Sequence, residues 1–218
     1  MSNAASTQAR TLGTSSPRSA ISGRALVLGS TSAYRRELLG RLRIPFMVCR
    51  PDVDEAPLPG ESPRDLALRL ALAKAQTVAR QHPLAVVIGS DQVADLQGEP
   101  LGKPGNHERA TTQLRRMRGR TVVFQTALAV VCIESGFEQV DLAPVRVRFL
   151  TADEGLDDAA IEAYLLAEKP YDCAGSAKSE GLGIALLADI SSDDPTALVG
   201  LPLIRTCRMI RAAGVKLL

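Results

Sequence analysis

Residues 120–150 read RTVVFQTALAVVCIESGFEQVDLAPVRVRFL, and this stretch decides the class of fold. Two long runs rich in valine are separated by Glu-Ser-Gly at 134–136, which predicts two strands joined in a hairpin. Shorter apolar runs alternate with helical patterns elsewhere in the chain. A long hairpin among such units indicates an α/β fold with a mixed central sheet flanked by helices, rather than a purely parallel sheet.

The neighbouring elements follow from apolar runs and helix caps. The expected strands span 24–30, 46–50, 84–90 and 183–187, with 91–100 as a strand entering a turn. The expected helices span 32–42, 62–81, 106–118 and 201–213. Ser62 suits the N-cap of the second helix, and Pro63 suits its first position. A further helix should open at Thr151, because Glu154 completes a capping box there.

The composition is that of an ordinary globular protein. The 218 residues are 45% hydrophobic and 23% charged, and no apolar stretch reaches the roughly 18 residues of a membrane span. A net charge of +2 and an aromatic content of 3% argue against nucleic acid as a partner. The four cysteines lie far apart without a Cys-x-x-Cys pair. We therefore expect reduced thiols, a cytoplasmic location, and neither a membrane nor a nucleic-acid partner.

Residues 1–23 differ from the rest of the chain. They are rich in Ser, Thr and Arg and contain no acidic residue, which is one property of an organellar transit peptide. A sustained amphipathic period is missing, however, so we favour a disordered leader. The fold is then expected to occupy residues 24–218 as one domain.

The stretch LVLGSTSAYRR at 26–36 is a candidate anion site. A strand that turns into a helix aims several backbone N–H groups at one point, and the helix dipole adds to their effect. Ser30 and Ser32 can donate hydroxyl hydrogen bonds, and Arg35 and Arg36 can bind phosphate oxygens. A capped helix with a solvated arginine pair explains the same residues equally well.

Three further residues point to phosphate chemistry. Lys74 lies on the apolar side of its predicted helix, so it either snorkels to solvent or reaches a buried anion. Asp91 directly follows an apolar strand, and ligands of α/β proteins bind at the carboxyl ends of strands; an aspartate that caps a turn is the alternative. Glu55 belongs to the acidic loop PDVDEAP, which suits Mg²⁺ or Mn²⁺ but is also typical of a solvated loop.

Two glycine-containing loops add more charge. The stiff loop LGKPG presents Lys103, and CAGSAKSEG places Lys178 and Glu180 in a loop that could wrap a ligand. Together the cations and carboxylates make the mixture that a metal–triphosphate site needs. The cations are Arg35, Arg36, Lys74, Lys103 and Lys178, and the carboxylates are Glu55, Asp91 and Glu180.

These motifs resemble those of the Maf family of nucleoside triphosphate pyrophosphatases. The resemblance runs from about residue 24 to the last helix through STSAYRRELL, DVDE, LALAKA, GSDQV, GKP, CAGSAKSEG and LVGLPL, in that order. It implies a mixed sheet, two lobes with a deep cleft, and often a homodimer. It also implies metal-dependent hydrolysis of a nucleotide to its monophosphate and pyrophosphate, with Mg²⁺ or Mn²⁺ as the cofactor.

The resemblance also assigns roles. The positions matching the family's catalytic residues are Ser30, Arg35, Glu55, Lys74, Asp91 and Lys103. Asp91 matches the proton acceptor, and we expect Glu55 and Asp91 to hold the metal. Tyr34, Gln92 and Glu180 match positions that vary between branches, and here they resemble the branch that acts on 7-methyl-GTP. Ser32, Arg36 and Lys178 complete our set of expected substrate-binding residues. Ala33 departs from the family, which usually has Pro there, and this puts the rigidity of the loop in doubt.

Two other functions fit the same residues. A nucleotidyltransferase also places a loop of small residues and an arginine after its first strand. A non-catalytic regulator that binds a nucleotide, with a role in cell division, belongs to a different class. Release of pyrophosphate without an acceptor, over many turnovers, separates hydrolysis from both.

Overall fold

The computed structural model of the protein describes residues 23–218, and the leader predicted at 1–23 lies outside this range except for its last residue. The strands are β1 (Leu26–Gly29), β2 (Met47–Cys49), β3 (Val86–Leu96), β4 (Glu99–Leu101), β5 (Thr121–Cys132), β6 (Phe137–Phe149) and β7 (Leu187–Ser191). The α-helices are α1 (Ala33–Gly40), α2 (Pro63–Gln81), α3 (His107–Met117), α4 (Asp158–Glu168) and α5 (Leu203–Ala212). Short 3-10 helices are η1 (Ala174–Ser176), η2 (Leu182–Leu186) and η3 (Ala197–Val199).

The seven strands form one mixed sheet, as predicted. Their order is β2-β1-β3-β5-β6-β7, and β4 pairs with β3 beyond the end of β1. The pairs β1/β2 and β1/β3 are parallel, whereas the other pairs are antiparallel. The hairpin predicted at 120–150 is confirmed, because β5 and β6 pair along their whole length from Thr121↔Arg148 to Cys132↔Phe137.

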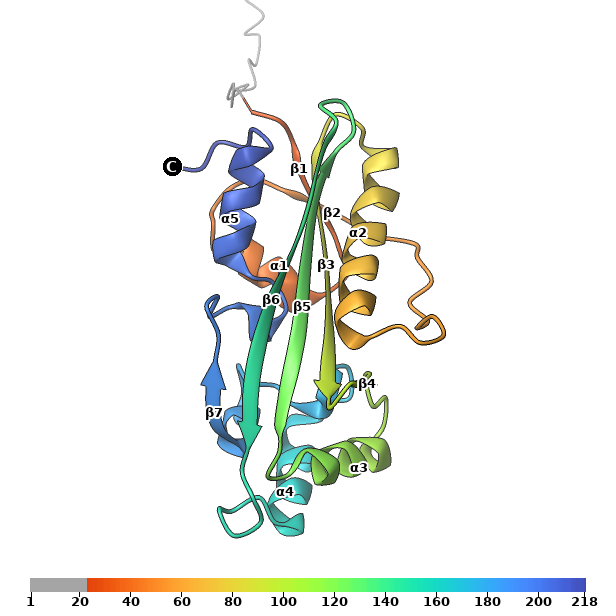
Figure 1. Cartoon of the computed structure of the whole chain (residues 1–218). Helices are drawn as coiled ribbons and strands as arrows, with labels where there is room; N and C mark the ends of the chain where they lie inside the picture. Colours follow the sequence, from red (N-terminus) through yellow and green to blue (C-terminus); the bar gives the residue numbers. More distant parts are fainter. Residues whose placement is uncertain (1–22) are drawn as a thin grey trace, which may run out of the picture.

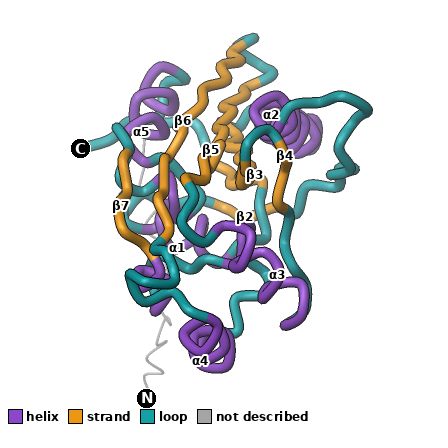
Figure 2. The backbone as a smooth tube through the Cα atoms, turned by 60° about the horizontal axis from the view of Figure 1, so that its bottom comes forward, coloured by secondary structure: helices purple, strands orange, loops and turns teal. Residues whose placement is uncertain are grey.

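The helices cover the sheet in a way that separates two ends of the molecule. At one end, α2 covers one face and α1 and α5 cover the other, while α3 and α4 lie at the opposite end (Figures 1 and 2). The period of two along β3 explains the two faces: Val87 packs in the core under α2, whereas Val86 and Ile88 pack in the core with α1 and α5. A separate core surrounds Phe124 and Phe149 where α3 and α4 pack. The long strands β3, β5 and β6 pass through both ends.

Two predicted boundaries are wrong. The capping box at Thr151 forms, with its backbone N–H donating to Glu154 at 2.8 Å, but it closes a turn and α4 begins only at Asp158. Gly155, at φ +111°, interrupts the helix between them, and Asp157 is the true N-cap. The strand predicted at 183–187 is mostly the 3-10 helix η2, and β7 begins at Leu187.

The sheet has an open edge in the middle of β3. Strand β1 pairs with β3 as far as Gly29↔Gly89, and β4 pairs with it only from Ala94↔Leu101. Residues 90–93 therefore have a partner strand on the β5 side alone within residues 23–218. In the same range, no helix is both long and apolar enough to cross a membrane.

Candidate active site

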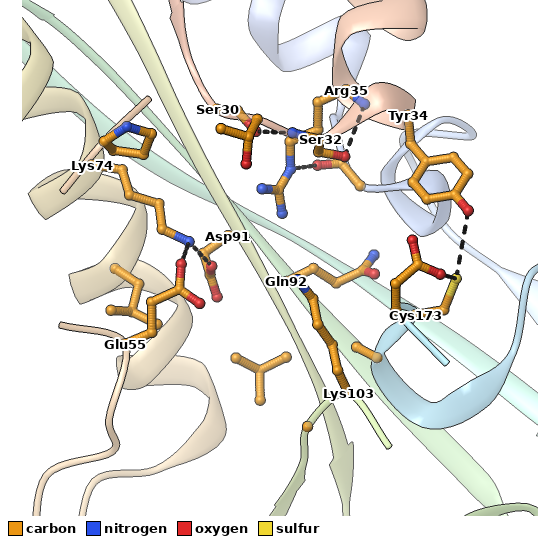
Figure 3. A pocket seen from close by; sticks show the side chains of 18 of the residues that line it. Ser30, Ser32, Tyr34, Arg35, Glu55, Lys74, Asp91, Gln92, Lys103 and Cys173 are labelled. Atoms are coloured by element: carbon orange, nitrogen blue, oxygen red, sulfur yellow. Dashed lines mark hydrogen bonds and ion pairs between the residues drawn. The ribbon is translucent and has the colours of Figure 1, made fainter. Parts of the chain in front are cut away.

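A cavity of about 980 Å³ opens along this unpaired edge of β3. Its walls come from the loops that follow β1, β2 and β4, from α2, and from the segments at 172–180 and 198–200. Figure 3 shows predicted residues from these separate elements pointing into one space. The predicted residues that line it are Ser30, Ser32, Tyr34, Arg35, Glu55, Lys74, Asp91, Gln92, Lys103 and Glu180. Arg36 and Lys178 are not among the lining residues.

The start of α1 forms the first wall. Ser32 is its N-cap and accepts a hydrogen bond from the backbone N–H of Arg35 at 3.4 Å, while the buried Ser30 Oγ accepts from the Ser32 N–H at 3.1 Å. Arg35 Nε donates to the carbonyl of Gly200 at 2.9 Å, which fixes the plane of the guanidinium. Its terminal nitrogens make no hydrogen bond with other described residues, so they are available to a ligand in the cavity.

The opposite wall carries a buried ion network. Lys74 Nζ, on α2, lies 2.6 Å from Asp91 Oδ1 and 2.6 Å from Glu55 Oε1. The Lys74 residue is only 5% exposed and Asp91 is 7% exposed, so the pair is held in a medium where charges interact strongly. Of the two explanations for Lys74, the structure shows the one in which it reaches a buried anion (Figure 3).

The charge of Glu55 is set by its surroundings. Burial raises the pKa of its carboxyl, but the hydrogen bond from Lys74 and the positive charges of Lys74, Lys103 and Arg35 outweigh this and leave the pKa below its ordinary value. Burial lowers the pKa of the Arg35 guanidinium, although Asp91 and Glu55 oppose the effect. Glu55 is therefore ionised at neutral pH, and its negative charge interacts with the positive charges of Lys74, Lys103 and Arg35.

A glycine brings Lys74 and Asp91 together. At Gly89 an added Cβ would lie 2.3 Å from the carbonyl oxygen of Ala71 and 2.5 Å from the backbone nitrogen of Ala75. Helix α2 thus lies directly on β3, two residues before Asp91. This close approach puts the Lys74 side chain over the open edge of the strand.

The predicted position of Asp91 in its strand is wrong. We expected it at the carboxyl end of an apolar strand, but β3 continues to Leu96, because antiparallel pairing with β5 extends from Asp91↔Ala127 to Asp95↔Val123. The strand that ends beside the cavity is β1, at Gly29. Asp91 lies just past that end. It is therefore beside a strand terminus, as expected, but the terminus belongs to β1 and not to β3.

The amide of Gln92 has a fixed orientation. Its Nε2 donates to Thr126 Oγ1 at 2.9 Å and to the carbonyls of Leu198 at 2.9 Å and Ala197 at 3.0 Å. All three partners are acceptors in this arrangement, since the single hydroxyl hydrogen of Thr126 is directed to the carbonyl of Ala197 at 3.0 Å. Gln92 Oε1 accepts no hydrogen bond from described residues and remains available on the cavity side.

The far end of the cavity is aromatic and acidic. Tyr34, Asp172, Cys173 and Glu180 line it, and Cys173 Sγ lies 3.9 Å from the Tyr34 hydroxyl oxygen and 3.6 Å from Asp172 Oδ1. Burial raises the pKa of Cys173 to about 12, with a contribution from the charge of Asp172. Burial likewise raises the pKa of Tyr34, and the negative charges of Asp172 and Glu180 add to this. Neither carboxylate forms an ion pair with a described lysine or arginine.

Lys178 stabilises its own loop and does not line the cavity. Its ammonium lies 2.5 Å from Glu168 Oε1, and the other oxygen of Glu168 accepts from the backbone N–H of Leu182 at 2.8 Å. The hydroxyl of Tyr164 accepts from the Lys178 backbone N–H and donates to the carbonyl of Ser176. These contacts fasten the loop that carries Glu180 to α4.

Comparison with known proteins identifies the family of the chain. A family model described as "Maf-like protein" matches residues 25–213. The chain belongs to the Maf family. It is 74% identical to a protein of Polaromonas sp. named 7-methyl-GTP pyrophosphatase, over 89% of this chain and 87% of that one. Proteins with the same name from Albidiferax ferrireducens and Cupriavidus pinatubonensis are 69% and 59% identical, and they cover 89% and 87% of this chain and 96% and 93% of their own lengths.

The structure of this Maf protein adds residues that sequence reasoning missed. Arg50 lines the cavity immediately before the acidic loop, and Asp172 lines it immediately before the CAGSAKSEG motif. Adjacency to recognised motifs was the only signal for these two residues. Thr126 carried no signal at all, because its role depends on the register that places it opposite Gln92.

The Maf cavity has a donor set suited to a hard divalent cation. Glu55 and Asp91 each direct one oxygen to Lys74 and have a second oxygen for another partner. No group of three or more His, Cys, Asp or Glu side chains with metal-ligand geometry occurs in residues 23–218. Mg²⁺ is commonly bound by only one or two carboxylates together with substrate phosphates, so this pair fits Mg²⁺ or Mn²⁺ at a site that a phosphate completes.

Proposed function

We propose that the protein hydrolyses 7-methyl-GTP at the bond between the α and β phosphates, giving 7-methyl-GMP and pyrophosphate. Its close relatives bear the name 7-methyl-GTP pyrophosphatase, and they match it over nearly all of their lengths. The observation that carries the proposal is the division of charge within one cavity. Arg35, Lys74 and Lys103 are grouped around Glu55 and Asp91, whereas Asp172 and Glu180 are grouped around Tyr34 without a cationic partner. A ligand with an anionic tail and a cationic ring matches both ends.

The cationic end binds the triphosphate. Arg35 and Lys103 line the cavity without forming an ion pair to any described carboxylate, so their charges are available to phosphate oxygens. Lys74 shares its charge with Asp91 and Glu55, and it therefore orients these two carboxylates as well as contributing to the positive field. Ser30 and Ser32 help hold the loop at the start of α1 on which Arg35 is mounted.

Asp91 accepts the proton of the attacking water. Its Oδ1 is bonded to Lys74, which leaves Oδ2 as the oxygen that can face solvent in the cavity. Water adds to the α phosphorus as its proton passes to Asp91, the bond from the α phosphorus to the bridging oxygen breaks, and pyrophosphate leaves with that oxygen. Positioned acid–base groups of this kind typically contribute about 10²- to 10⁴-fold in rate.

Glu55 and Asp91 are the residues that would hold the metal cofactor, directly or through water. When bound there, Mg²⁺ or Mn²⁺ would neutralise phosphate charge and favour departure of pyrophosphate. Glu55 is suited to this role because it remains ionised at neutral pH. Its loop is exposed, so one carboxylate can rearrange when phosphate binds, while Asp91 stays fixed on β3.

The acidic end recognises the base. Methylation at N7 gives guanine a positive charge, which Tyr34 can stack against and which Asp172 and Glu180 can attract. The ion pair of Lys178 is made with Glu168 rather than with Glu180. The selectivity for the methylated base is thus expected to come from charges at this end.

Pyrophosphate release measured across GTP, 7-methyl-GTP, dTTP, UTP and ATP, with and without Mg²⁺ or Mn²⁺, tests the proposal. We expect many turnovers without an acceptor, fastest with 7-methyl-GTP, and strongly reduced by Asp91→Asn. Turnover only with an added acceptor would identify a nucleotidyltransferase, and binding without turnover would identify a regulator. The names of the relatives favour neither alternative.

The proposal extends to the protein in the cell. We place the catalytic unit in residues 24–218, acting in the cytoplasm on free nucleotides rather than on nucleic acid or at a membrane, and assembled as a homodimer. Sedimentation of the full chain and of a form beginning at residue 24, each assayed for pyrophosphate release, tests the unit and its assembly.

A further inference from the structure

A side chain outside the cavity joins two of its walls. Gln113 lies on α3 and is not among the residues that line the cavity. Its Nε2 donates to the carbonyl of Gly102 at 3.0 Å, and its Oε1 accepts from the hydroxyl of Ser176 at 2.6 Å. Gly102 belongs to the loop that presents Lys103, whereas Ser176 belongs to the wall segment at 172–180. Gln113 therefore links these two walls through one amide group.

The orientation of this amide is fixed by its partners. The carbonyl oxygen of Gly102 can only accept a hydrogen bond, so the nitrogen of Gln113 must face it and the oxygen must face Ser176. Ser176 is a firm anchor, because it is 0% exposed and its own carbonyl accepts from the hydroxyl of Tyr164 at 3.1 Å. Both ends of the Gln113 side chain are thus in use within the protein.

The loop that presents Lys103 has a second attachment to the same neighbouring segment. The backbone N–H of Gly105 donates to the carbonyl of Tyr171 at 3.0 Å, so the attachments lie on both sides of the lysine. The Lys103 residue itself is exposed, and its positive charge helps to lower the pKa of Glu55. Because the side chain is not packed, the backbone from which it extends decides where its charge lies.

We propose that Gln113 is a positioning residue for Lys103, holding the loop at Gly102 so that the lysine is presented to the phosphates of the substrate. The proposal rests on the proposed function and adds to it a residue that touches no part of the cavity. Without the amide the loop keeps only the backbone bond at Gly105, and Lys103 then samples more positions. A more mobile cation loses more conformational entropy when it binds a phosphate, so the affinity for polyphosphate falls.

Binding of inorganic pyrophosphate, measured by titration calorimetry in the presence of Mg²⁺, tests the proposal without requiring turnover. Gln113→Met removes both hydrogen bonds and keeps a straight side chain of similar helix propensity. We expect it to raise the Kd of pyrophosphate by about fivefold, the usual worth of one net hydrogen bond. Lys103→Ala should raise the Kd by at least about tenfold, because it removes a charged donor.

A double-mutant cycle separates positioning from general damage to the fold. Added to Lys103→Ala, Gln113→Met should change the Kd by less than about twofold, because the amide acts through the lysine. Ser176→Ala leaves the bond to Gly102 in place and should raise the Kd by only about twofold. Thr112→Ala is the matched control on α3, since the exposed Thr112 hydroxyl donates only to the Glu108 carbonyl of its own helix, at 3.0 Å. This control should bind pyrophosphate as wild type does.

Each outcome decides for or against the positioning role. An unchanged Kd in Gln113→Met would overturn it, because the backbone bond at Gly105 would then suffice to hold the loop. An equal loss of affinity with and without Lys103 would also overturn it, as would wild-type affinity in Lys103→Ala. Failure of wild type to release pyrophosphate from 7-methyl-GTP would instead refute the proposed function, and the binding measurement does not depend on that release.

Discussion

Replacing Gly89 by alanine tests whether the close packing of α2 on β3 holds Lys74 and Asp91 together. The new Cβ would lie 2.3 Å from the Ala71 carbonyl oxygen and 2.5 Å from the Ala75 nitrogen. Both are backbone atoms, so no change of side-chain rotamer relieves the contact. The helix must move away by roughly 0.7 Å before the shorter contact reaches 3.0 Å, which overpacks the interface.

Two magnitudes follow from this displacement. Overpacking costs about 1–3 kcal/mol, and the upper end applies here because both contacts are with backbone, so we expect Tm to fall by about 6–12 °C. Lys74 lies on the displaced helix and Asp91 on the strand. In the native protein Lys74 Nζ is 2.6 Å from Asp91 Oδ1. Because a misplacement of about 1 Å can cost 10²-fold in rate, we expect kcat to fall by about 10- to 100-fold.

Thermal unfolding followed by circular dichroism and steady-state pyrophosphate release supply the two measurements. Gly40→Ala is the control, because nothing lies within 4 Å of its added Cβ and the residue is helical. This variant should be unchanged or stabilised by up to about 1 kcal/mol. A Gly89→Ala variant with the Tm and kcat of wild type would refute the reasoning, because α2 would then not determine where Lys74 lies.

Other predictions concern single side chains. Asp91→Asn should lower kcat by about 10²- to 10⁴-fold. The variant should remain folded but have a lower Tm, because the buried Lys74 loses one of its two carboxylate partners. Asp172→Asn and Glu180→Gln should each narrow the preference for 7-methyl-GTP over GTP, measured as a ratio of kcat/KM, while leaving hydrolysis of GTP in place. The lowered pKa of Glu55 means that its carboxylate stabilises the fold above its ordinary pKa of 4.5. The Tm advantage of wild type over Glu55→Gln should therefore shrink as the pH falls below that ordinary value. With its pKa at about 12, Cys173 should react with iodoacetamide at pH 8 far more slowly than free cysteine.

Local patterns predicted most of the elements in this chain. The hairpin is confirmed because both strands are long and rich in β-formers, and α2 begins where Ser62 and Pro63 indicate, with Ser62 Oγ accepting from the Asp65 N–H at 3.1 Å. The predicted start of the helix at Thr151 is wrong, although the sequence pattern that suggested it is present and forms its hydrogen bonds. The capping box at Thr151 forms its hydrogen bonds, yet no helix follows directly, since such a box satisfies backbone groups in a turn as well.

The composition of the cavity could be predicted further than its geometry. An isolated lysine on an apolar helix face fits either snorkelling to solvent or contact with a buried anion, and the sequence does not decide between them. It does not identify Asp91 as the partner either, because the contact depends on packing between α2 and β3. Lys178 and Glu180 are two residues apart and equally prominent in the sequence. Only the structure shows that one is paired with Glu168 while the other lines the cavity.

The continuity of three long strands has a consequence for how the enzyme can move. The strands β3, β5 and β6 continue without interruption from the end that carries α2 to the end that carries α3 and α4. Both walls of the cavity are therefore attached to the same three strands. Bending one wall toward the other would shear ladders of hydrogen bonds, which makes hinge closure unfavourable. Substrate capture is then left to exposed segments such as the loop around Glu55. Turnover would accordingly respond to changes in loop length at 50–62 far more than to changes that stiffen the sheet.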